Sequence, residues 1–137
     1  MNKNLHSKNE IETEKAGFDF AKSLQAGDLV FLYGDLGFGK TTFVKGVARG
    51  LGIKTRIISP TFTIVREHKN LYHIDLYRIE SKSQIDGLGL SEILQSDYIK
   101  LIEWPENMFD NLPSKRIDVK ILLNKDNTRT INIIKYE

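Results

Sequence analysis

The sequence predicts a single α/β domain of three layers, with a mixed central sheet. Two observations carry this prediction. Leu29–Tyr33 is an unbroken apolar run followed by a helical pattern at residues 41–51, which is typical of a buried parallel strand and its crossover helix. Near the C-terminus, two segments of alternating hydrophobicity flank a turn, which is typical of an antiparallel hairpin. The sheet should therefore be parallel beside Leu29–Tyr33 and antiparallel at its C-terminal edge.

The length and composition favour one compact domain. The 137 residues are 40% hydrophobic, enough for one core but not for two ordinary domains, so we expect residues 1–137 to form a single unit. A net charge of only +2, from 20 basic and 18 acidic residues, argues against tight autonomous RNA binding. Cysteine is absent, which excludes disulfides and thiolate metal sites. No apolar run reaches membrane-spanning length and the N-terminus lacks a signal-peptide pattern, so we expect a cytoplasmic protein.

The first half of the chain predicts a helix, a strand and a second helix. Between about residues 10 and 24, four apolar side chains recur at near-helical spacing before a turn signal at 25–28. They are Ile11, Phe18, Ala21 and Leu24. After the strand at Leu29–Tyr33, the helix at 41–51 has one apolar face, and Gly52 follows as a C-terminal cap. That face consists of Phe43, Val44, Val47 and Leu51.

The second half predicts mostly strands. Residues 81–96 are helical in patches, with an interruption at 86–89. The expected strands are 57–58, 62–67, 71–74, 98–102 and the two hairpin arms, 117–123 and 129–134. These elements fit a helix-flanked mixed sheet.

Residues 34–41 match the phosphate-binding loop pattern G-x-x-x-x-G-K-[ST], between the first strand and the second helix. Backbone N–H groups of such a loop surround phosphates, Lys40 reaches the β/γ-phosphates, and the Thr41 hydroxyl ligates Mg²⁺. The N-terminus of the helix adds a positive dipole end. The domain is therefore predicted to be P-loop NTPase-like. The residues expected to contact the nucleotide are Gly34, Asp35, Leu36, Gly37, Phe38, Gly39, Lys40, Thr41 and Thr42.

Residues 124–127, Asn-Lys-Asp-Asn, come close to the guanine-reading N-K-x-D element. The last position is Asn127 rather than the aspartate that would bind guanine, and the segment lies where the hairpin needs turn residues. We interpret it as a turn, so ATP is the expected nucleotide.

Hydrolysis also requires an acid near the metal and a group that positions water. Asp75 and Glu103 each follow an apolar strand, where α/β sheets gather their ligands. Either could hold Mg²⁺ through a water or orient the attacking water, and spacing alone does not assign the roles. Each could instead cap a strand end or pair with Arg78. Thr61, after a proline turn, could be a switch residue or an ordinary strand residue.

Four blocks in series resemble the TsaE family, also called YjeE. They are residues 34–43 (GDLGFGKTTF), 59–65 (SPTFTIV), 73–78 (HIDLYR) and 101–106 (LIEWPE). The resemblance covers almost the whole chain. The one clear departure is Phe38, where the family usually has a small residue.

The resemblance implies an ATPase of bacterial tRNA threonylcarbamoyladenosine biosynthesis, with ATP and Mg²⁺ as ligands. Its catalytic residues would be Lys40, Asp75 and Glu103, and its metal ligands Thr41 and Glu103, the latter as the Walker B-like acid. Asp75 would position water or metal. The family also places the N-terminal segment and the C-terminal hairpin near adenine. The residues this adds to the nucleotide site are Ser7, Glu10, Thr13 and Arg129.

The family further implies two protein partners, TsaB and TsaD, which transfer a threonylcarbamoyl group to adenosine 37 of tRNA. ATP hydrolysis would reset that complex between turnovers, with tRNA reached only through it and without a membrane or DNA partner. Two alternatives remain: a small P-loop kinase, and a nucleotide-dependent binding switch. A kinase usually needs an arginine-rich lid, and no segment after Glu103 clusters arginines. Loss of ATP without any small acceptor would exclude the kinase.

Overall fold

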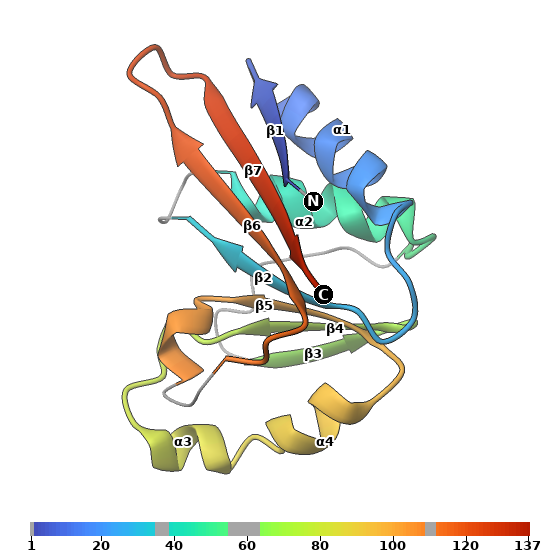
Figure 1. The fold of residues 1–137 in the computed structure, drawn as a ribbon, viewed down its shortest axis with the longest axis vertical. Helices are drawn as coiled ribbons and strands as arrows, with labels where there is room; N and C mark the ends of the chain where they lie inside the picture. Colours follow the sequence, from blue (N-terminus) through green and yellow to red (C-terminus); the bar gives the residue numbers. More distant parts are fainter. Residues whose placement is uncertain (1, 35–38, 55–63, 109–111) are drawn as a thin grey trace.

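The computed structural model describes residues 2–34, 39–54, 64–108 and 112–137, and within them seven strands form one sheet (Figure 1). The strand order is β1-β7-β6-β2-β5-β4-β3. The strands are β1 (Asn2–Ser7), β2 (Leu29–Tyr33), β3 (Val65–His68), β4 (Leu71–Asp75), β5 (Ile99–Glu103), β6 (Arg116–Leu123) and β7 (Arg129–Tyr136). The helices are α1 (Glu10–Ala21), α2 (Lys40–Gly50), α3 (Lys82–Asp86), α4 (Leu90–Gln95) and the 3-10 turn η1 (Pro105–Met108).

The sheet is mixed, as predicted. β2 pairs in parallel with both β5 and β6, and β4 pairs in parallel with β5. The C-terminal edge is antiparallel, because β6 and β7 form the expected hairpin, and β3 adds a second antiparallel pair at the opposite edge. β1, which pairs antiparallel with β7, was not predicted from the sequence. Its residues are polar and mostly exposed, so backbone pairing rather than an apolar pattern makes it a strand.

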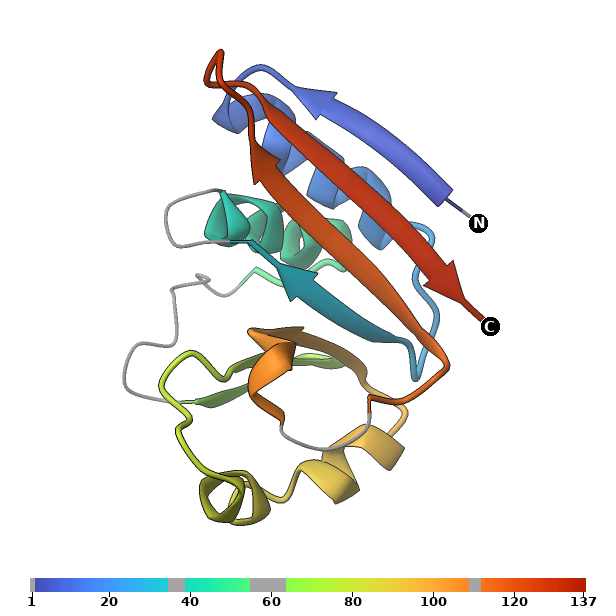
Figure 2. The ribbon, with the colours of Figure 1, turned by 60° about the vertical axis from the view of Figure 1, so that its left-hand side comes forward.

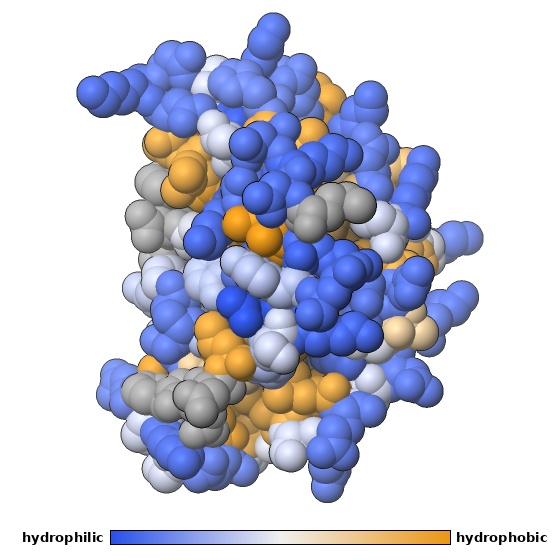
Figure 3. Space-filling model, in the orientation of Figure 1, coloured by the Kyte–Doolittle hydropathy of each residue, from blue (hydrophilic) through white to orange (hydrophobic). Residues whose placement is uncertain are grey.

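Helices lie on both faces of the sheet (Figures 1 and 2). Alternate residues of β2 enter two separate cores: Val30 and Leu32 pack with α1 and α2, whereas Leu29 and Phe31 pack with α3, α4 and η1. Space-filling Figure 3 shows mostly hydrophilic residues over β6 and β7, with apolar ones gathering lower down, towards α3 and α4. The three-layer prediction is confirmed.

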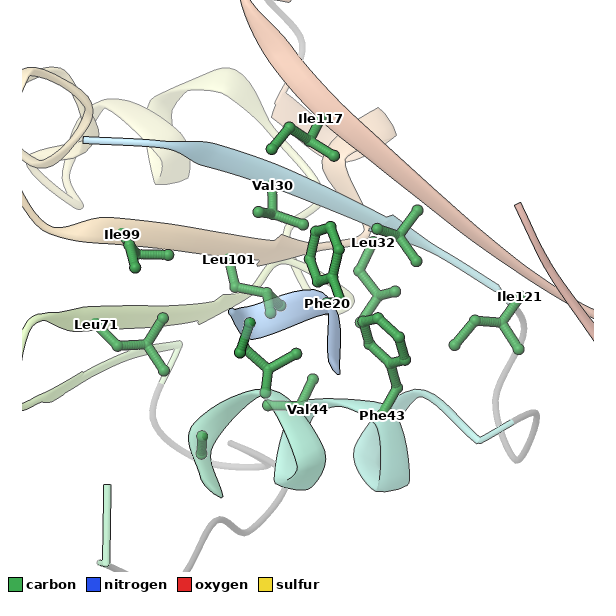
Figure 4. Close-up of a cluster of buried hydrophobic side chains, with 14 of the residues drawn as sticks. Phe20, Val30, Leu32, Phe43, Val44, Leu71, Ile99, Leu101, Ile117 and Ile121 are labelled. Atoms are coloured by element: carbon green, nitrogen blue, oxygen red, sulfur yellow. The ribbon is translucent and has the colours of Figure 1, made fainter. Parts of the chain in front are cut away.

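The first core fixes α2 against the sheet. Phe43 and Val44 point from the helix toward Val30, Leu32 and Leu101, and all five side chains are fully buried (Figure 4). Because α2 begins at Lys40, this packing also fixes the end of the phosphate-binding loop relative to the strand ends.

Two helices, α1 and α2, touch backbone to backbone through glycine. A Cβ atom on Gly46 would lie 2.0 Å from the carbonyl oxygen of Glu14, and one on Gly17 would lie 2.2 Å from that of Phe43. The predicted apolar face of α1 is partly wrong, because Ile11 is 81% exposed. The helix turns its small residues, rather than its largest aliphatic one, toward its neighbour. Its buried side consists of Thr13, Gly17, Phe20 and Ala21.

We expect Gly46→Ala to lower the free energy of unfolding by about 3 kcal/mol, because the added methyl group forces the two helix backbones apart. Gly87→Ala is the matched control, since a Cβ there would meet nothing closer than 3.6 Å. Urea denaturation of the two variants measures the difference. Equal stabilities would contradict the backbone contact.

Candidate functional site

The described part of the phosphate-binding loop places an uncapped helix end at the carboxyl ends of the central parallel strands. Gly39 precedes α2 with a left-handed φ of 92°, which favours glycine, and it offers no side chain to the first-turn N–H groups. Thr41 and Thr42, both half-buried, lie in that first turn, which holds no acidic residue. These N–H groups can therefore receive an anion. Residues 35–38 lie outside the described residues, so the predicted contacts of Asp35, Leu36, Gly37 and Phe38 stay predictions.

Lys40 is only 5% exposed and points toward Glu103. Its Nζ lies 3.9 Å from Glu103 Oε1 and 4.4 Å from the centre of the Trp104 ring. Gly34, the first loop glycine, follows β2, and a Cβ on it would contact the Lys40 side chain. A buried ammonium group needs a negative partner, and Glu103 supplies it in this structure.

Glu103 ends β5 at the centre of the parallel strands, in register with Leu32 of β2 and Asp75 of β4. The residue is 5% exposed. His73 Nε2–H donates a hydrogen bond of 2.6 Å to Oε2, while Oε1 faces Lys40. The two oxygens therefore have separate neighbours, and His73 fixes the orientation of the carboxylate.

The second predicted acid, Asp75, lies beside the first. It is half-buried, and its Oδ1 accepts a hydrogen bond of 3.0 Å from the Tyr77 N–H. Burial raises the pKa of Asp75 above its ordinary value, and the Tyr77 N–H opposes the rise. The negative charge of Glu103 raises this pKa further. The structure thus brings together the two acids that spacing alone could not rank.

An aromatic pair covers this group of charges. The Trp104 ring, on a residue with φ of 57°, lies 5.0 Å from the Tyr77 ring, with Lys40 over its face. Trp104 is half-buried and Tyr77 is 46% exposed. Tyr77 was not among the residues predicted from the sequence, although it lies within the block at 73–78. Its signal was an aromatic residue two positions after a strand-end acid.

Three of the four residues expected near adenine lie together. Ser7 and Thr13 are buried and share a hydrogen bond of 2.7 Å, and Ser7 is opposite Arg129 in the β1–β7 register. The Arg129 side chain lies against Gly39, because a Cβ there would be 3.0 Å from Arg129 Nε. Glu10 is exposed at the start of α1. The structure therefore brings Ser7, Thr13 and Arg129 together, with Arg129 against the loop, and their role toward adenine stays a prediction.

Residues 124–127 form the turn that was predicted. Asn127 has a left-handed φ of 67°, and its N–H donates to the carbonyl of Asn124. The Asn124 amide donates to the hydroxyls of Thr128 and Thr130, so its side chain serves the hairpin. Two other predictions, the strand at 57–58 and the switch role of Thr61, lie outside the described residues.

An uncapped glycine-led helix end, a buried lysine and an acid at the end of a neighbouring strand define a P-loop NTPase-like protein. The crystal structure of Bacillus subtilis YdiB has the same fold, with a TM-score of 0.85 and 35% sequence identity, covering 100% of this chain and 87% of that one.

Sequence comparison identifies the family. A sequence model described as threonylcarbamoyl adenosine biosynthesis protein TsaE matches residues 7–131, and the chain belongs to the TsaE family. The tRNA threonylcarbamoyladenosine biosynthesis protein TsaE of Bacillus subtilis is 41% identical over 90% of this chain and 79% of its own length. That of Treponema pallidum is 35% identical over 93% and 96%. In the described residues, no helix is long and apolar enough to cross a membrane.

We expect Asp75→Asn to stabilise the nucleotide-free protein at neutral pH, because it removes a half-buried charge and keeps an acceptor for Tyr77 N–H. The pKa of Asp75 is higher in the folded than in the unfolded protein, so the charged carboxylate lowers the stability of the folded protein at pH values above the folded-state pKa. The penalty is absent below the unfolded pKa, where both states are protonated. The gain should therefore vanish in acid.

Thermal unfolding of wild type and variant from neutral to acidic pH measures this gain. Asp86→Asn, at an exposed position of α3, controls for the loss of one negative charge. A pH-independent difference for Asp75→Asn would contradict the shifted pKa.

Proposed function

We propose that this chain binds ATP with Mg²⁺ and hydrolyses it to ADP and phosphate, in the cytoplasm, as the ATPase of tRNA threonylcarbamoyladenosine synthesis at position 37. It would act on the TsaB–TsaD complex and permit repeated turnover. The observation that carries the proposal is the buried Lys40–Glu103 pair at the uncapped start of α2. The relatives named above support the pathway.

The residues present fit a magnesium nucleotide. The N–H groups of the first turn of α2 and the Lys40 ammonium would bind phosphate oxygens. Thr41 and Glu103 would hold Mg²⁺, which would neutralise the negative charge of the phosphates. Phosphate would replace Glu103 as the counter-ion of Lys40 and leave Oε1 available, while His73 keeps Oε2. The 124–127 element serves the turn, so adenine is the expected base.

Asp75 is suited to orient and deprotonate the attacking water. It lies in register beside Glu103, and burial makes its carboxylate more basic than an exposed one. A general base works best when its pKa approaches the working pH. Trp104 and Tyr77 would limit the access of other water to Lys40.

We expect Lys40→Ala to weaken the binding of ATP and Mg²⁺ by roughly a hundredfold or more, because charge-assisted contacts to phosphate are lost. Lys45→Ala, at an exposed position of the same helix, should bind normally. Calorimetry on both variants, with circular dichroism to confirm folding, is the measurement. Wild-type affinity in folded Lys40→Ala would contradict the phosphate-binding role of the loop.

The two acids should separate by kinetics. We expect Glu103→Gln to weaken Mg²⁺-dependent nucleotide binding, and Asp75→Asn to spare binding but lower kcat at least roughly tenfold. Binding with and without Mg²⁺ and steady-state ATP hydrolysis provide the data. The opposite pattern would exchange the two roles.

The proposed function as a whole is tested with the partners. We expect slow ATP hydrolysis by the isolated chain and stimulation by TsaB, TsaD and tRNA together, since P-loop enzymes gain roughly 10³ to 10⁵ in rate when a partner completes the site. Loss of ATP without any small acceptor would argue against a kinase. Fast hydrolysis that does not change on adding the partners would contradict this function.

A further inference from the structure

A cluster of three nitrogen-bearing side chains lies on β3 and β4, next to Glu103. Arg66 of β3 is directly opposite His73 of β4 in the antiparallel register, so both side chains leave the same face of the sheet. His68 lies two residues along β3 and shares that face. We call these three residues the β3–β4 cluster. His73 links this cluster to the candidate ATP site, because its Nε2 is hydrogen-bonded to Glu103.

The cluster contains buried polar atoms without partners. Arg66 Nε, His68 Nε2 and His73 Nδ1 are all buried, and among the described residues none of them has a hydrogen-bond partner. His73 itself is only 1% exposed. Within residues 2–34, 39–54, 64–108 and 112–137, no carboxylate pairs with Arg66. Buried polar groups in native proteins are nearly always paired, so three adjacent exceptions point to a ligand.

The electrostatics of the cluster favour an anion. Burial lowers the pKa of His68, and the neighbouring His73 and Arg66 lower it further, which places the three groups within mutual electrostatic reach. The guanidinium of Arg66 stays charged and presents planar N–H donors that match an oxyanion. An anion here would offset that charge and accept hydrogen bonds from the N–H donors that lack a partner.

The hydrogen-bond roles narrow the choice of anion. His73 is hydrogen-bonded to Glu103 through Nε2, so Nδ1 is the ring nitrogen left for a ligand. A ligand that fits must accept from Arg66 and also form a hydrogen bond with His73 Nδ1. Phosphate near neutral pH carries both oxygen acceptors and a P–O–H donor, so it can serve either role toward Nδ1.

We propose that Arg66, His68 and His73 form a subsite for inorganic phosphate, distinct from the phosphate-binding loop and linked to Glu103 through His73. We take ATP hydrolysis as the source of this phosphate, and that part of the inference rests on the proposed function. In that role the subsite would receive the phosphate next to the acids of the candidate ATP site, while ADP stays on the loop.

The experiment is calorimetric titration of inorganic phosphate into the protein saturated with ADP and Mg²⁺, which fills the loop. Wild type should bind phosphate. Arg66→Gln should weaken phosphate binding roughly tenfold to a hundredfold, the range for losing hydrogen bonds to a charged group. Lys69→Gln removes the same charge from the exposed turn after β3 and should bind as wild type. His68→Gln is a second variant and should also weaken binding.

Unchanged phosphate affinity in both Arg66→Gln and His68→Gln would overturn the subsite, as would the absence of phosphate binding. ATP hydrolysis by the same wild-type preparation separates this inference from the proposed function. Hydrolysis without phosphate binding overturns the subsite alone. Phosphate binding that depends on Arg66, without hydrolysis, supports the subsite and overturns its proposed source.

Discussion

The buried carboxylate of Glu103 constrains the rest of the structure. An ionised group this deep costs several kcal/mol unless it is paired and hydrogen-bonded. His73 meets this need from β4 and Lys40 from the start of α2, so the central strands and the helix must hold a fixed relative position. The first core, with Phe43 at its centre, maintains that position, and the glycine contact with α1 supports it from behind. Fold stability and the candidate chemistry therefore depend on the same few contacts.

Local patterns were sufficient for much of the fold. The β2 run, the glycine-rich loop and α2 follow one another in the chain, and each has its own signal, so they were predicted directly. The hairpin of β6 and β7 was predictable for the same reason. β1 was not, because Asn2–Ser7 has no alternating apolar pattern and becomes a strand only where β7 offers an edge. The exposed Ile11 shows that periodicity cannot report backbone contacts made by glycine.

The site shows the same division. Asp75 and Glu103 could be picked out as strand-end acids from the sequence, whereas their position side by side follows from the register of β4 and β5. The meeting of Ser7 with Arg129 depends on pairing across 121 intervening positions, so it came only from family resemblance. The β3–β4 cluster had no sequence signal, since a strand register between neighbours cannot be read from two short segments.

The pairing of β1 with β7 also brings the two ends of the chain close to each other. Asn2 lies opposite Ile134, and Figures 1 and 2 both show the two labelled ends of the chain close together. A short linker could therefore join them, and new ends could be opened in the exposed turn at 124–128 without removing any strand. Anything attached at either end would emerge on the same side of the molecule, at the opposite end of β7 from Arg129. Fusions placed there would leave the candidate nucleotide site open to its ligands.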